Sequence, residues 1–493
     1  MTLDNLIRNL NYIKLINNNN NTITALTINS KQVTKDYLYV AIKGFNVDGH
    51  RFIHSAIKQG ATAILCENLD FLDEIKKLND VDLDNICFIQ VYNTRQALSK
   101  ICQNFYGKPT ESFDLIGITG TNGKTSTTYF MEQILTEYKQ STGVIGTIEI
   151  RANQEKLNFD FATSTTPDTI ELNELFCKFN EKNIKNIIME VSSHALELNK
   201  VDYCKFKLAI FTNLSQDHLD LHQNMDNYCN AKAKLFEMCE IAVVNADDNY
   251  TPSILKNCNA KVLTYSIEKE SDLQAVNIKY FMDKVTFDVN INNKLESFEL
   301  NIPAKFSVYN ALGVIGASIM LGIPVDVIKK GIYNIKGVAG RIQNIPNDKG
   351  FNVLVDYAHS PDGLDNIIKA VKHFTKNRVI TVFGCGGDRD AKKRPIMGEI
   401  AGSLSDYCII TSDNPRSEVP EEIIKQVEVG TKRVTQSYEK ITDRKEAIFK
   451  AIEMAKFGDS VIIAGKGHEN YEIFADKIIH FDDTEVAQEA LNI

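Results

Sequence analysis

The chain has 493 residues, of which 43% are hydrophobic, and its formal net charge at pH 7 is −9. At about 100 to 200 residues per domain, this length indicates two to four globular domains with proper cores. The acidic balance disfavours a surface for nucleic acid or for an anionic membrane. A small anionic substrate would therefore need dedicated arginines and lysines.

Neither a leader nor a membrane span is expected from the sequence. The start MTLDNLIRNLNYIKLI has no basic segment leading into an apolar stretch. Nowhere does an apolar run approach the about 18 residues that a membrane helix needs. The ten cysteines have no Cys-x-x-Cys pair and no metal-ligand spacing. We therefore expect a cytoplasmic protein with reduced thiols and no disulfide framework or zinc site.

The first fifth of the chain predicts an α/β domain. The asparagine run 17–21 is polar and aperiodic, which is typical of a surface loop. From about residue 35, short apolar runs such as YLYVAIKG and TAILC alternate with helical stretches. This pattern ends near residues 107–109, where Gly-Lys-Pro indicates a boundary.

Residues 115–126, LIGITGTNGKTS, predict a buried strand, a glycine-cornered loop and the start of a helix. Such a loop is a phosphate cradle, in which backbone N–H groups and the positive helix end face an anion. Lys124 would reach phosphate oxygens, and the Thr125 hydroxyl could bind Mg²⁺. Only two residues separate Gly120 from Gly123, whereas the usual Walker loop has four in that place. A plain turn is the alternative for the loop taken alone.

The central strands predict a parallel sheet with polar groups at their carboxyl ends. The runs NIIMEV, KLAIFTNL and CEIAVVNAD each end in polar residues and are separated by helix-length segments. Glu190, which ends the first run, is predicted to bind a second Mg²⁺, although an acid that caps a loop is the alternative. Asp217, His218, Asp220 and His222 follow the second run and suggest metal or phosphate chemistry. His222 and His194 are equally compatible with structural roles.

Lys232 occupies an unusual position for a lysine. The segment Tyr228-Cys-Asn-Ala-Lys232 continues into the apolar residues Leu235 and Phe236, which places the lysine on the helix face that turns to the sheet. Taken alone, a lysine there is most simply a side chain whose charged end reaches out to water.

A further set of apolar runs begins near Gly340 and predicts a separate doubly wound domain. Its strands end in glycine, acid or arginine, in FNVLVDYAHSP, RVITVFGCGGDRD, YCIITSDNPR and DSVIIAGKGHE. Helices are expected to begin at Ser360-Pro361-Asp362 and Pro420-Glu421-Glu422. Arg389, Arg416 and Lys466 would place three cations at one rim, where they favour an anionic substrate. DNPR alone is also compatible with an Asx turn.

Taken in order, these motifs resemble the Mur ligases over nearly the whole chain. The ordered motifs are GTNGKT, STTPD, EVSSH, NLSQDHLD, YCNAK, NADD, VYNAL, GR, DYAHSPDG, GCGGDRD, SDNPR and AGKGHE. The resemblance implies an α/β fold of three domains, namely a nucleotide-sugar-binding domain at 1–108, a central ATP-binding domain with a P-loop at 109–340 and a Rossmann-like amino-acid-binding domain at 341–493.

DNPR, GCGGDRD and AGKGHE are similar to those of the family member that joins meso-2,6-diaminopimelate to UDP-N-acetylmuramoyl-L-alanyl-D-glutamate in peptidoglycan precursor synthesis. The resemblance implies an ATP-dependent amide ligase that forms an acyl phosphate. A monomer is expected, although the sequence itself does not give the oligomeric state. The alternatives are a folylpolyglutamate synthase-like ligase and a P-loop regulatory module without ligase activity. Whether a close analogue such as lanthionine is the amine stays open.

The resemblance also implies roles for individual residues. Lys124, Glu190, His218 and Lys232 would be catalytic, with Mg²⁺ held by Thr125, Glu190, His218 and a Lys232 that CO₂ has carbamylated. The residues implied to bind ATP are Gly120, Thr121, Asn122, Gly123, Lys124, Thr125, Asn245, Asn310, Arg341 and Asp356. Those implied to bind the UDP-muramoyl dipeptide are Ser30, Ser164, Thr165, Thr166, Ser192 and Lys200. Those implied to bind diaminopimelate are Arg389, Asp413, Asn414, Pro415, Arg416, Gly465 and Glu469.

Several positions depart from the family pattern. The usual Asp-Ser-Arg of the first domain is Asn29-Ser30-Lys31, an expected arginine is Lys200, and an expected Gly-Arg is Ala304-Lys305. Each lysine keeps the charge but loses the planar fork of arginine. These departures concern contacts to the nucleotide sugar rather than the reaction.

Overall fold

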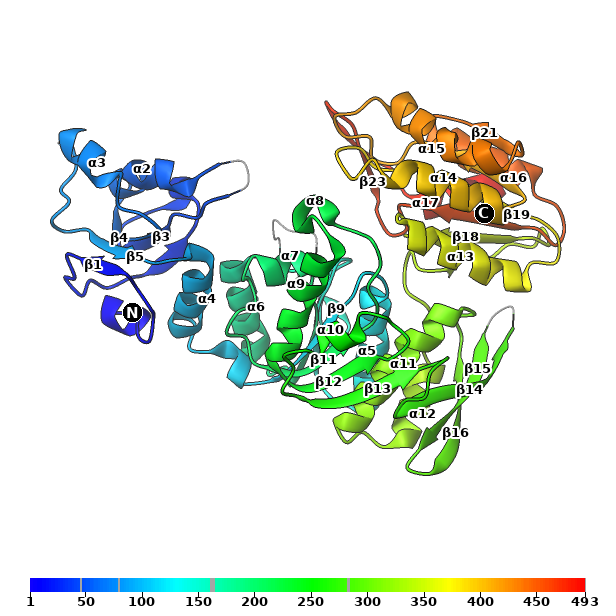
Figure 1. The fold of residues 1–493 in the computed structure, drawn as a ribbon, viewed down its shortest axis with the longest axis horizontal. Coiled ribbons are helices and arrows are strands. Elements are labelled where there is room, and N and C mark those ends of the chain that lie inside the picture. Colours follow the sequence, from blue (N-terminus) through cyan, green and yellow to red (C-terminus); the bar gives the residue numbers. More distant parts are fainter. Residues whose placement is uncertain (45–46, 79, 160–164, 282–283, 493) are drawn as a thin grey trace. The chain divides into compact units, whose positions relative to one another are not determined.

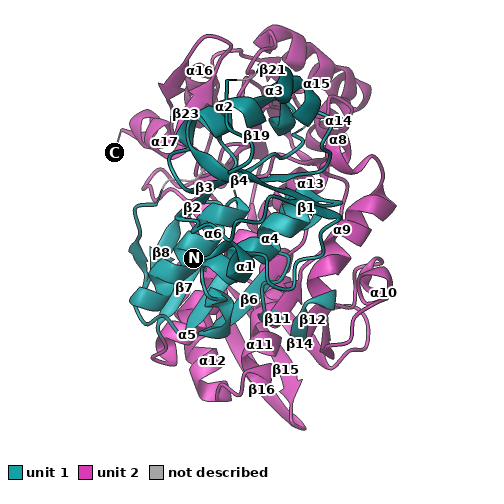
Figure 2. Ribbon diagram, turned by 90° about the vertical axis from the view of Figure 1, so that its left-hand side faces the viewer, with its two compact units in different colours: residues 1–117, 141–208, 237–240 teal, residues 118–140, 209–236, 241–493 magenta. Residues whose placement is uncertain are grey.

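The computed structural model describes residues 1–44, 47–78, 80–159, 165–281 and 284–492. Its ribbon is shown in Figure 1. The contacts divide the chain into two compact units, coloured separately in Figure 2, of which unit 1 comprises residues 1–117, 141–208 and 237–240 and unit 2 comprises residues 118–140, 209–236 and 241–493. Three strands pass from one unit into the other, and these are β6 (Asp114–Thr119), β11 (Phe206–Phe211) and β12 (Cys239–Asn245).

Unit 1 begins with a small sheet in the order β1-β5-β4-β3-β2, in which β1 is antiparallel to β5 and the other pairs are parallel. Its strands are β1 (Lys14–Ile16), β2 (Ala25–Thr27), β3 (Tyr37–Val40), β4 (Ala61–Cys66) and β5 (Cys87–Gln90). Its helical segments are α1 (Leu3–Leu6), η1 (Ser30–Gln32), η2 (Gly49–Phe52), α2 (Ile53–Lys58), α3 (Leu72–Leu78), α4 (Thr94–Phe105) and η3 (Pro109–Glu111). Apolar clusters cover both faces of the sheet. The predicted first α/β domain is therefore present, and the asparagine run 17–21 is a loop.

The rest of unit 1 supplies a second group of strands. They are β7 (Thr142–Ile145), β8 (Ile150–Ala152), β9 (Glu155–Lys156) and β10 (Asn186–Glu190). β10 is parallel to β7, and β7, β8 and β9 continue as antiparallel neighbours. The helices here are α6 (Thr169–Glu181) and α7 (Ser193–Glu197).

Unit 2 contains the helix of the phosphate loop, α5 (Lys124–Glu137). Its buried residues Thr127, Phe130, Met131 and Ile134 recur at helical spacing. The other helices before residue 340 are α8 (Leu219–His222), α9 (Met225–Glu237), α10 (Thr251–Ile254), α11 (Lys305–Met320) and α12 (Val325–Tyr333). The strands β12 and β13 (Lys261–Ser266) are parallel. β13 is parallel to β14 (Leu273–Tyr280), which continues antiparallel into β15 (Val285–Ile291) and β16 (Lys294–Leu300).

The carboxyl-terminal sheet follows the order β17-β18-β22-β19-β20-β21. All its neighbours are parallel except β17 and β18. The strands are β17 (Gln343–Asn344), β18 (Asn352–Asp356), β19 (Val379–Phe383), β20 (Tyr407–Ile410), β21 (Tyr438–Lys440) and β22 (Ser460–Ala464), and a separate hairpin is formed by β23 (Tyr471–Ile473) and β24 (Ile478–His480).

Helices cover both faces of this sheet, as the doubly wound prediction requires. One apolar cluster packs α13 (Pro361–Phe374), α14 (Lys393–Leu404) and α15 (Pro420–Val434) against it, and another packs α16 (Arg444–Met454) and α17 (Asp483–Leu491). The predicted starts of α13 and α15 at Pro361 and Pro420 are confirmed. Ligand groups are expected at the carboxyl ends of these strands.

Two further predictions concern features shared by the whole chain. All ten cysteines are free thiols in the structure. Among the described residues, no helix combines the length and the apolar character that crossing a membrane requires.

Candidate functional site: a phosphate loop and a charged cluster

The phosphate loop, residues 120–125, needs glycine at both of its corners. Gly120 and Gly123 have φ angles of +153° and +87°, which side-chain-bearing residues rarely adopt. A Cβ at Gly120 would overlap the Thr212 hydroxyl, and one at Gly123 would overlap the carboxamide oxygen of Asn310 on α11. Asn310 therefore lies directly against the loop.

The segment after β11 holds the loop by hydrogen bonds. The backbone N–H of Thr121 donates to the Asn213 carbonyl at 2.9 Å, and that of Asn122 donates to Asn213 Oδ1 at 3.0 Å. The Thr121 hydroxyl donates to the Ser215 carbonyl at 3.1 Å. These bonds explain how a loop shorter than a Walker loop keeps its shape. As a result, the N–H groups of Thr121 and Asn122, which were expected to face an anion, point towards Asn213 instead. The positive end of α5 begins next, at Lys124.

Two lysines meet at the carbonyl of Gly120. Lys124 Nζ donates to it at 2.8 Å and to the Thr121 carbonyl at 2.9 Å, and Lys232 Nζ donates to it at 2.9 Å. Lys232 lies in the buried stripe of α9 and is 1% exposed. Burial and the positive charge of Lys124 hold the pKa of Lys232 well below its usual range. The lysine therefore does not reach water, contrary to the simplest interpretation of its sequence position.

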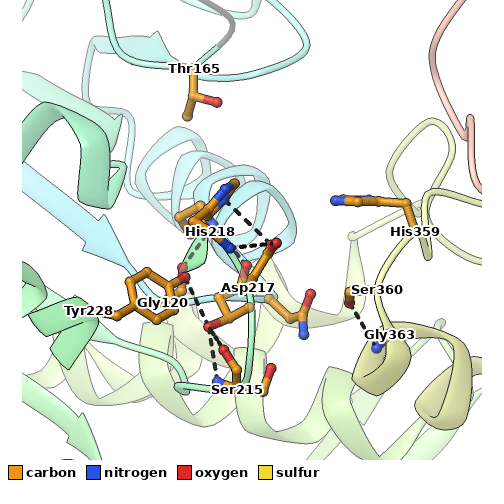
Figure 3. A network of polar contacts seen from close by, with 12 residues as sticks. Gly120, Thr165, Ser215, Asp217, His218, Tyr228, His359, Ser360 and Gly363 are labelled. Carbon is orange, nitrogen blue, oxygen red and sulfur yellow. Dashed lines mark hydrogen bonds and ion pairs between the residues drawn. The ribbon is translucent and has the colours of Figure 1, made fainter. Parts of the chain in front are cut away.

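Asp217 and His218 lie beside the loop, as Figure 3 shows. Burial raises the pKa of Asp217, but the positive charges of His218, His359 and Lys393 outweigh it and lower the value to about 2. Burial and Lys393 lower the pKa of His359 to about 4. His222 packs its ring on Tyr228 at 5.0 Å between centroids, which favours a structural role for it.

In unit 1, Glu190 ends β10 and is buried. Its carboxylate accepts bonds from the Thr147 N–H and the Thr147 hydroxyl, each at 3.0 Å. Thr166 donates to the Glu190 carbonyl at 2.9 Å and to Ser192 Oγ at 3.3 Å. The motifs STTPD and EVSSH are therefore joined by hydrogen bonds. Ser164, a predicted contact to the dipeptide, lies outside the described residues.

The other predicted dipeptide contacts in unit 1 are also placed by local bonds. Thr165 accepts a bond from the Thr147 hydroxyl at 3.2 Å. Lys200 is buried and pairs with Asp168, the N-cap of α6, at 2.6 Å. Ser30 begins η1, whose N-cap Asn29 accepts a bond from the Lys31 N–H at 3.0 Å. Asparagine and aspartate cap equally well, so the Asn29 departure preserves this turn.

Three predicted nucleotide contacts lie at strand ends or between strands. Asn245 ends β12, and its Nδ2 donates to the Thr212 carbonyl at 2.9 Å. Asp356 ends β18 and accepts bonds from the N–H groups of Ile342 and Ala358, each at 2.8 Å. The guanidinium of Arg341 lies 4.5 Å from the centroid of the Tyr357 ring, a cation–π contact.

The amino-acid cluster, defined as Asp413, Asn414, Arg416, Gly465 and Glu469, lies after the carboxyl ends of β20 and β22. Asn414 donates to Glu469 Oε2 at 2.8 Å and accepts from the Ile473 N–H at 3.0 Å. A Cβ at Gly465, whose φ is +122°, would meet Asp413 Oδ2 at 2.6 Å. Pro415 is buried between Asn414 and Arg416. The structure therefore gathers these predicted contacts to diaminopimelate.

The prediction that three cations lie at one rim is wrong for Lys466. Lys466 is completely buried, donates to Asn414 Oδ1 at 3.1 Å and pairs with Glu469 at 3.7 Å. It compensates charge inside the cluster instead of meeting an anion at the rim. Arg389 is exposed, and Arg416 Nη1 donates to the Gly387 carbonyl at 2.7 Å. The sequence around Gly465 and Lys466 did not indicate that the lysine side chain is buried.

Sequence reasoning also missed residues that hold the site. Asn213, Arg444 and Asp483 were not among the predicted site residues, although Asn213 holds the loop and Arg444 bonds to the Ser412 and Ala464 carbonyls beside the cluster. Only the tertiary contacts identify them. Within the part of the chain that the structure describes, no three His, Cys, Asp or Glu side chains group as metal ligands.

The order of the domains and the phosphate loop define a class of ligases built on this α/β fold. Residues 22–106 match the Mur ligase family catalytic domain, 118–318 the Mur ligase middle domain, and 340–467 the Mur ligase glutamate ligase domain. The chain belongs to the Mur ligase family and is a ligase. The predicted family and fold class are confirmed.

Particular relatives are similar over their full length. The chain is 43% identical over 491 residues to the "UDP-N-acetylmuramoyl-L-alanyl-D-glutamate--2,6-diaminopimelate ligase 2" of Clostridium acetobutylicum, covering 100% of both chains. It is 43% identical over 496 residues to the 2,6-diaminopimelate ligase of Clostridioides difficile, again covering 100% of both. A solved structure of such a ligase matches with a TM-score of 0.70 at 27% identity, covering 100% of this chain and 99% of that one. A Mycobacterium tuberculosis folylpolyglutamate synthase shares the fold alone, with a TM-score of 0.63, 15% identity and coverage of 81% and 95%.

Proposed function

We propose that the chain is an ATP-dependent ligase that joins meso-2,6-diaminopimelate to UDP-N-acetylmuramoyl-L-alanyl-D-glutamate in cytoplasmic peptidoglycan precursor synthesis. The observation that carries this proposal is the amino-acid cluster, in which the buried Asp413, the half-buried Glu469 and an arginine adjoin the ends of two parallel strands. An α-amino acid with a second carboxylate offers an ammonium for the acids and an anion for the arginine. The full-length relatives named for this reaction support the same substrate.

The two rival functions are less well supported. A folylpolyglutamate synthase-like ligase has support from fold similarity alone, because the matching structure is 15% identical. A P-loop regulatory module needs no second substrate site, yet the amino-acid cluster lies within the matched glutamate ligase domain.

In the proposed reaction, a glutamyl carboxylate oxygen attacks the γ-phosphorus of ATP, and ADP leaves. The amine of diaminopimelate then attacks the acyl carbon and loses a proton, and phosphate leaves with the former acyl oxygen. Lys124 would turn from the carbonyls of Gly120 and Thr121 to the phosphoryl oxygens and neutralise their charge. Most of the catalysis is alignment and charge stabilisation rather than acid–base chemistry.

The predicted metal ligands are compatible with a Mg²⁺ ion that enters the site bound to ATP. Mg²⁺ in such sites usually keeps waters and takes only one or two protein carboxylates besides the phosphates. The described residues contain no cluster of three side chains for an all-protein cage, which agrees with that pattern. We propose Thr125, Glu190, His218 and the modified Lys232 as ligands. When bound, the metal would offset charge on the transferring phosphoryl group.

We further propose that Lys232 carries a carbamate. Carbamylation requires a neutral amine, whose nitrogen bonds to the carbon of CO₂ and releases a proton. Burial and the charge of Lys124 favour the neutral amine of Lys232. The resulting anion would also replace the repulsion between the two lysines by attraction.

We propose the domain limits 1–108, 109–340 and 341–493 and a monomeric enzyme. We also propose that the remaining predicted residues bind the substrates assigned to them. Size-exclusion chromatography with light scattering tests the monomer, and a dimer at micromolar concentration would contradict it.

The function is tested by phosphate release from ATP by the purified enzyme. We expect release only when both the UDP-muramoyl dipeptide and meso-diaminopimelate are present, with a product whose mass equals an amide of the two. Parallel reactions contain L-lysine, lanthionine, or a folate with glutamate in place of the proposed pair. Release that needs no second substrate would support the regulatory module, and activity on the folate would support the synthase-like ligase.

A further inference from the structure

Arg444 and Asp483 form a buried ion pair behind the amino-acid cluster. They are the first residues of α16 and α17, and both side chains are 0% exposed. The guanidinium and carboxylate meet as a fork, with Nε to Oδ1 at 2.8 Å and Nη2 to Oδ2 at 2.7 Å. Such parallel bonds fix the orientation of the guanidinium as well as its position.

The guanidinium also joins the ends of two strands that are not neighbours. Nη1 donates to the Ser412 carbonyl at 3.2 Å, and Nη2 donates to the Ala464 carbonyl at 3.0 Å. These carbonyls precede Asp413 and Gly465, the first cluster residues after β20 and after β22. We call residues 413–416 and residues 465–469 the two walls of the cluster. Because β19 lies between β20 and β22, the sheet itself makes no hydrogen bond between those two strands. Arg444 supplies that link.

The two walls approach each other closely where Arg444 links them. A Cβ at Gly465 would meet Asp413 Oδ2 at 2.6 Å and Arg444 Nη2 at 3.8 Å. Burial raises the pKa of Asp413, and the charges of Lys466 and Arg444 more than offset this and keep the carboxylate ionised. A shift of Arg444 would therefore change both the spacing of the walls and the charge of Asp413.

We propose that Arg444 and Asp483 are a positioning pair for the incoming amino acid, which sets the separation of Asp413 and Gly465 without touching the substrate. This inference rests on the proposed function, because that function places the amino acid at the cluster. It gives the carboxyl-terminal helix α17 a role in substrate affinity, which it exerts through Asp483 and Arg444.

The test compares KM for the amino acid with KM for ATP in Asp483→Asn and Arg444→Lys. Asparagine keeps the shape of the acid but not its charge, and lysine keeps the charge but cannot reach all four acceptor oxygens of the guanidinium. A displacement of about 1 Å can weaken a reaction by about a hundredfold, so we expect KM for diaminopimelate to rise by at least about tenfold. KM for ATP should change by less than about twofold, because neither residue is among those proposed to bind ATP.

A control pair lies at the opposite edge of the same sheet. Arg378 and Asp459 precede β19 and β22, and Nη2 and Nε of Arg378 both donate to Asp459 Oδ2, at 2.6 Å and 3.2 Å, although the Arg378 side chain is 38% exposed. Asp459 is 1% exposed, as buried as Asp483. Asp459→Asn should lower the melting temperature of the protein without raising KM for diaminopimelate.

A double variant separates stability from positioning. Removing one partner leaves a buried charge, whereas replacing both by apolar residues often restores stability. Arg444→Met with Asp483→Leu should therefore melt at a higher temperature than Asp483→Asn and still show the raised KM for diaminopimelate, because the link between Ser412 and Ala464 is lost.

Each outcome bears on one of the two proposals. KM is measured with whichever amino acid the wild-type enzyme ligates, so an unexpected wild-type substrate contradicts the proposed function alone. The positioning pair is refuted if Asp483→Asn leaves that KM unchanged, if KM for ATP rises equally, or if the double variant restores both stability and KM. A wild-type enzyme that ligates no amino acid refutes both.

Discussion

The phosphate loop and the amino-acid cluster both follow parallel strands, yet they are held in different ways. The backbone of the loop is shaped by two glycines, Asn213 and the Thr121 hydroxyl, and the charged side chains Lys124 and Lys232 donate to its carbonyls. The cluster holds its charges in opposite pairs, with Lys466 and Arg444 close to the buried Asp413 and with Lys466 also paired with Glu469. Because other groups keep the loop in shape, Lys124 can exchange its two carbonyl acceptors for phosphate oxygens. A cluster held by balanced charges accepts only a ligand that preserves the balance.

Removal of the loop's lysine tests the first half of this comparison and should have the largest effect. We expect Lys124→Ala to lower kcat by more than about a hundredfold, the usual effect of losing one preorganised electrostatic group. Glu190→Ala should act similarly. The measurement is phosphate release at saturating ATP and Mg²⁺, and near-normal turnover would remove the loop from the mechanism.

Lys232 tests whether the loop region also needs an anion. Lys232→Ala should be nearly inactive, and acetate or formate should restore part of the activity by occupying the vacated anionic position. Lys234→Ala, on the same helix but outside its buried stripe, is the control and should stay active. An unmodified Lys232 in a native crystal at neutral pH, or full activity of Lys232→Ala, would speak against the carbamate.

Arg416 tests the second half of the comparison, since it would bind the distal carboxylate that L-lysine lacks. Wild-type kcat/KM for L-lysine should be at least about a thousandfold below that for diaminopimelate, because lysine leaves a charged partner unpaired. Arg416→Ala should cost about 2 to 4 kcal/mol in kcat/KM with diaminopimelate and much less with L-lysine. If the wild-type enzyme uses both within about tenfold, the specificity assignment is wrong while the ligase assignment stands.

The smallest effect should come from a change in the fold that supports the cluster. A Cβ at Gly430 of α15 would overlap the Pro395 carbonyl of α14, so Gly430→Ala must push the two helices apart. Overpacking of this kind costs about 1 to 3 kcal/mol. Calorimetry should show a lower melting temperature, whereas Val429→Ala, at a neighbouring position that is 52% exposed, should change it little. An unchanged melting temperature for Gly430→Ala would show that the helices can separate freely.

The strands and the starts of the helices followed from local patterns. Apolar runs such as 186–191 and 459–464 and the prolines at 361 and 420 are read from neighbouring residues, and the structure confirms them. The antiparallel strands β14, β15 and β16 were not predicted. The pairing of β15 with β16 is local, since Asn292 and Asn293 join two runs of alternating residues, which is a hairpin signal that the sequence analysis did not use.

The candidate site was predictable in its residue types but not in their orientation. GTNGKT and DNPR identified the loop and the cluster, since each motif is continuous in sequence. Lys466 was expected at the rim beside Arg389 and Arg416, and it is instead completely buried, where it bonds to Asn414 and pairs with Glu469. The fork of Arg444 and Asp483 joins residues 39 positions apart, and nothing in either local sequence announces the pair.

Within unit 2, the carboxylate of Asp362 accepts hydrogen bonds from Asn122 of the phosphate loop at 2.7 Å and from Ser215 at 3.2 Å. Asp362 is in the first turn of α13, which packs on the sheet that carries the amino-acid cluster. Where ATP changes the affinity for the amino acid through this connection, the amino acid must change the affinity for ATP by the same factor.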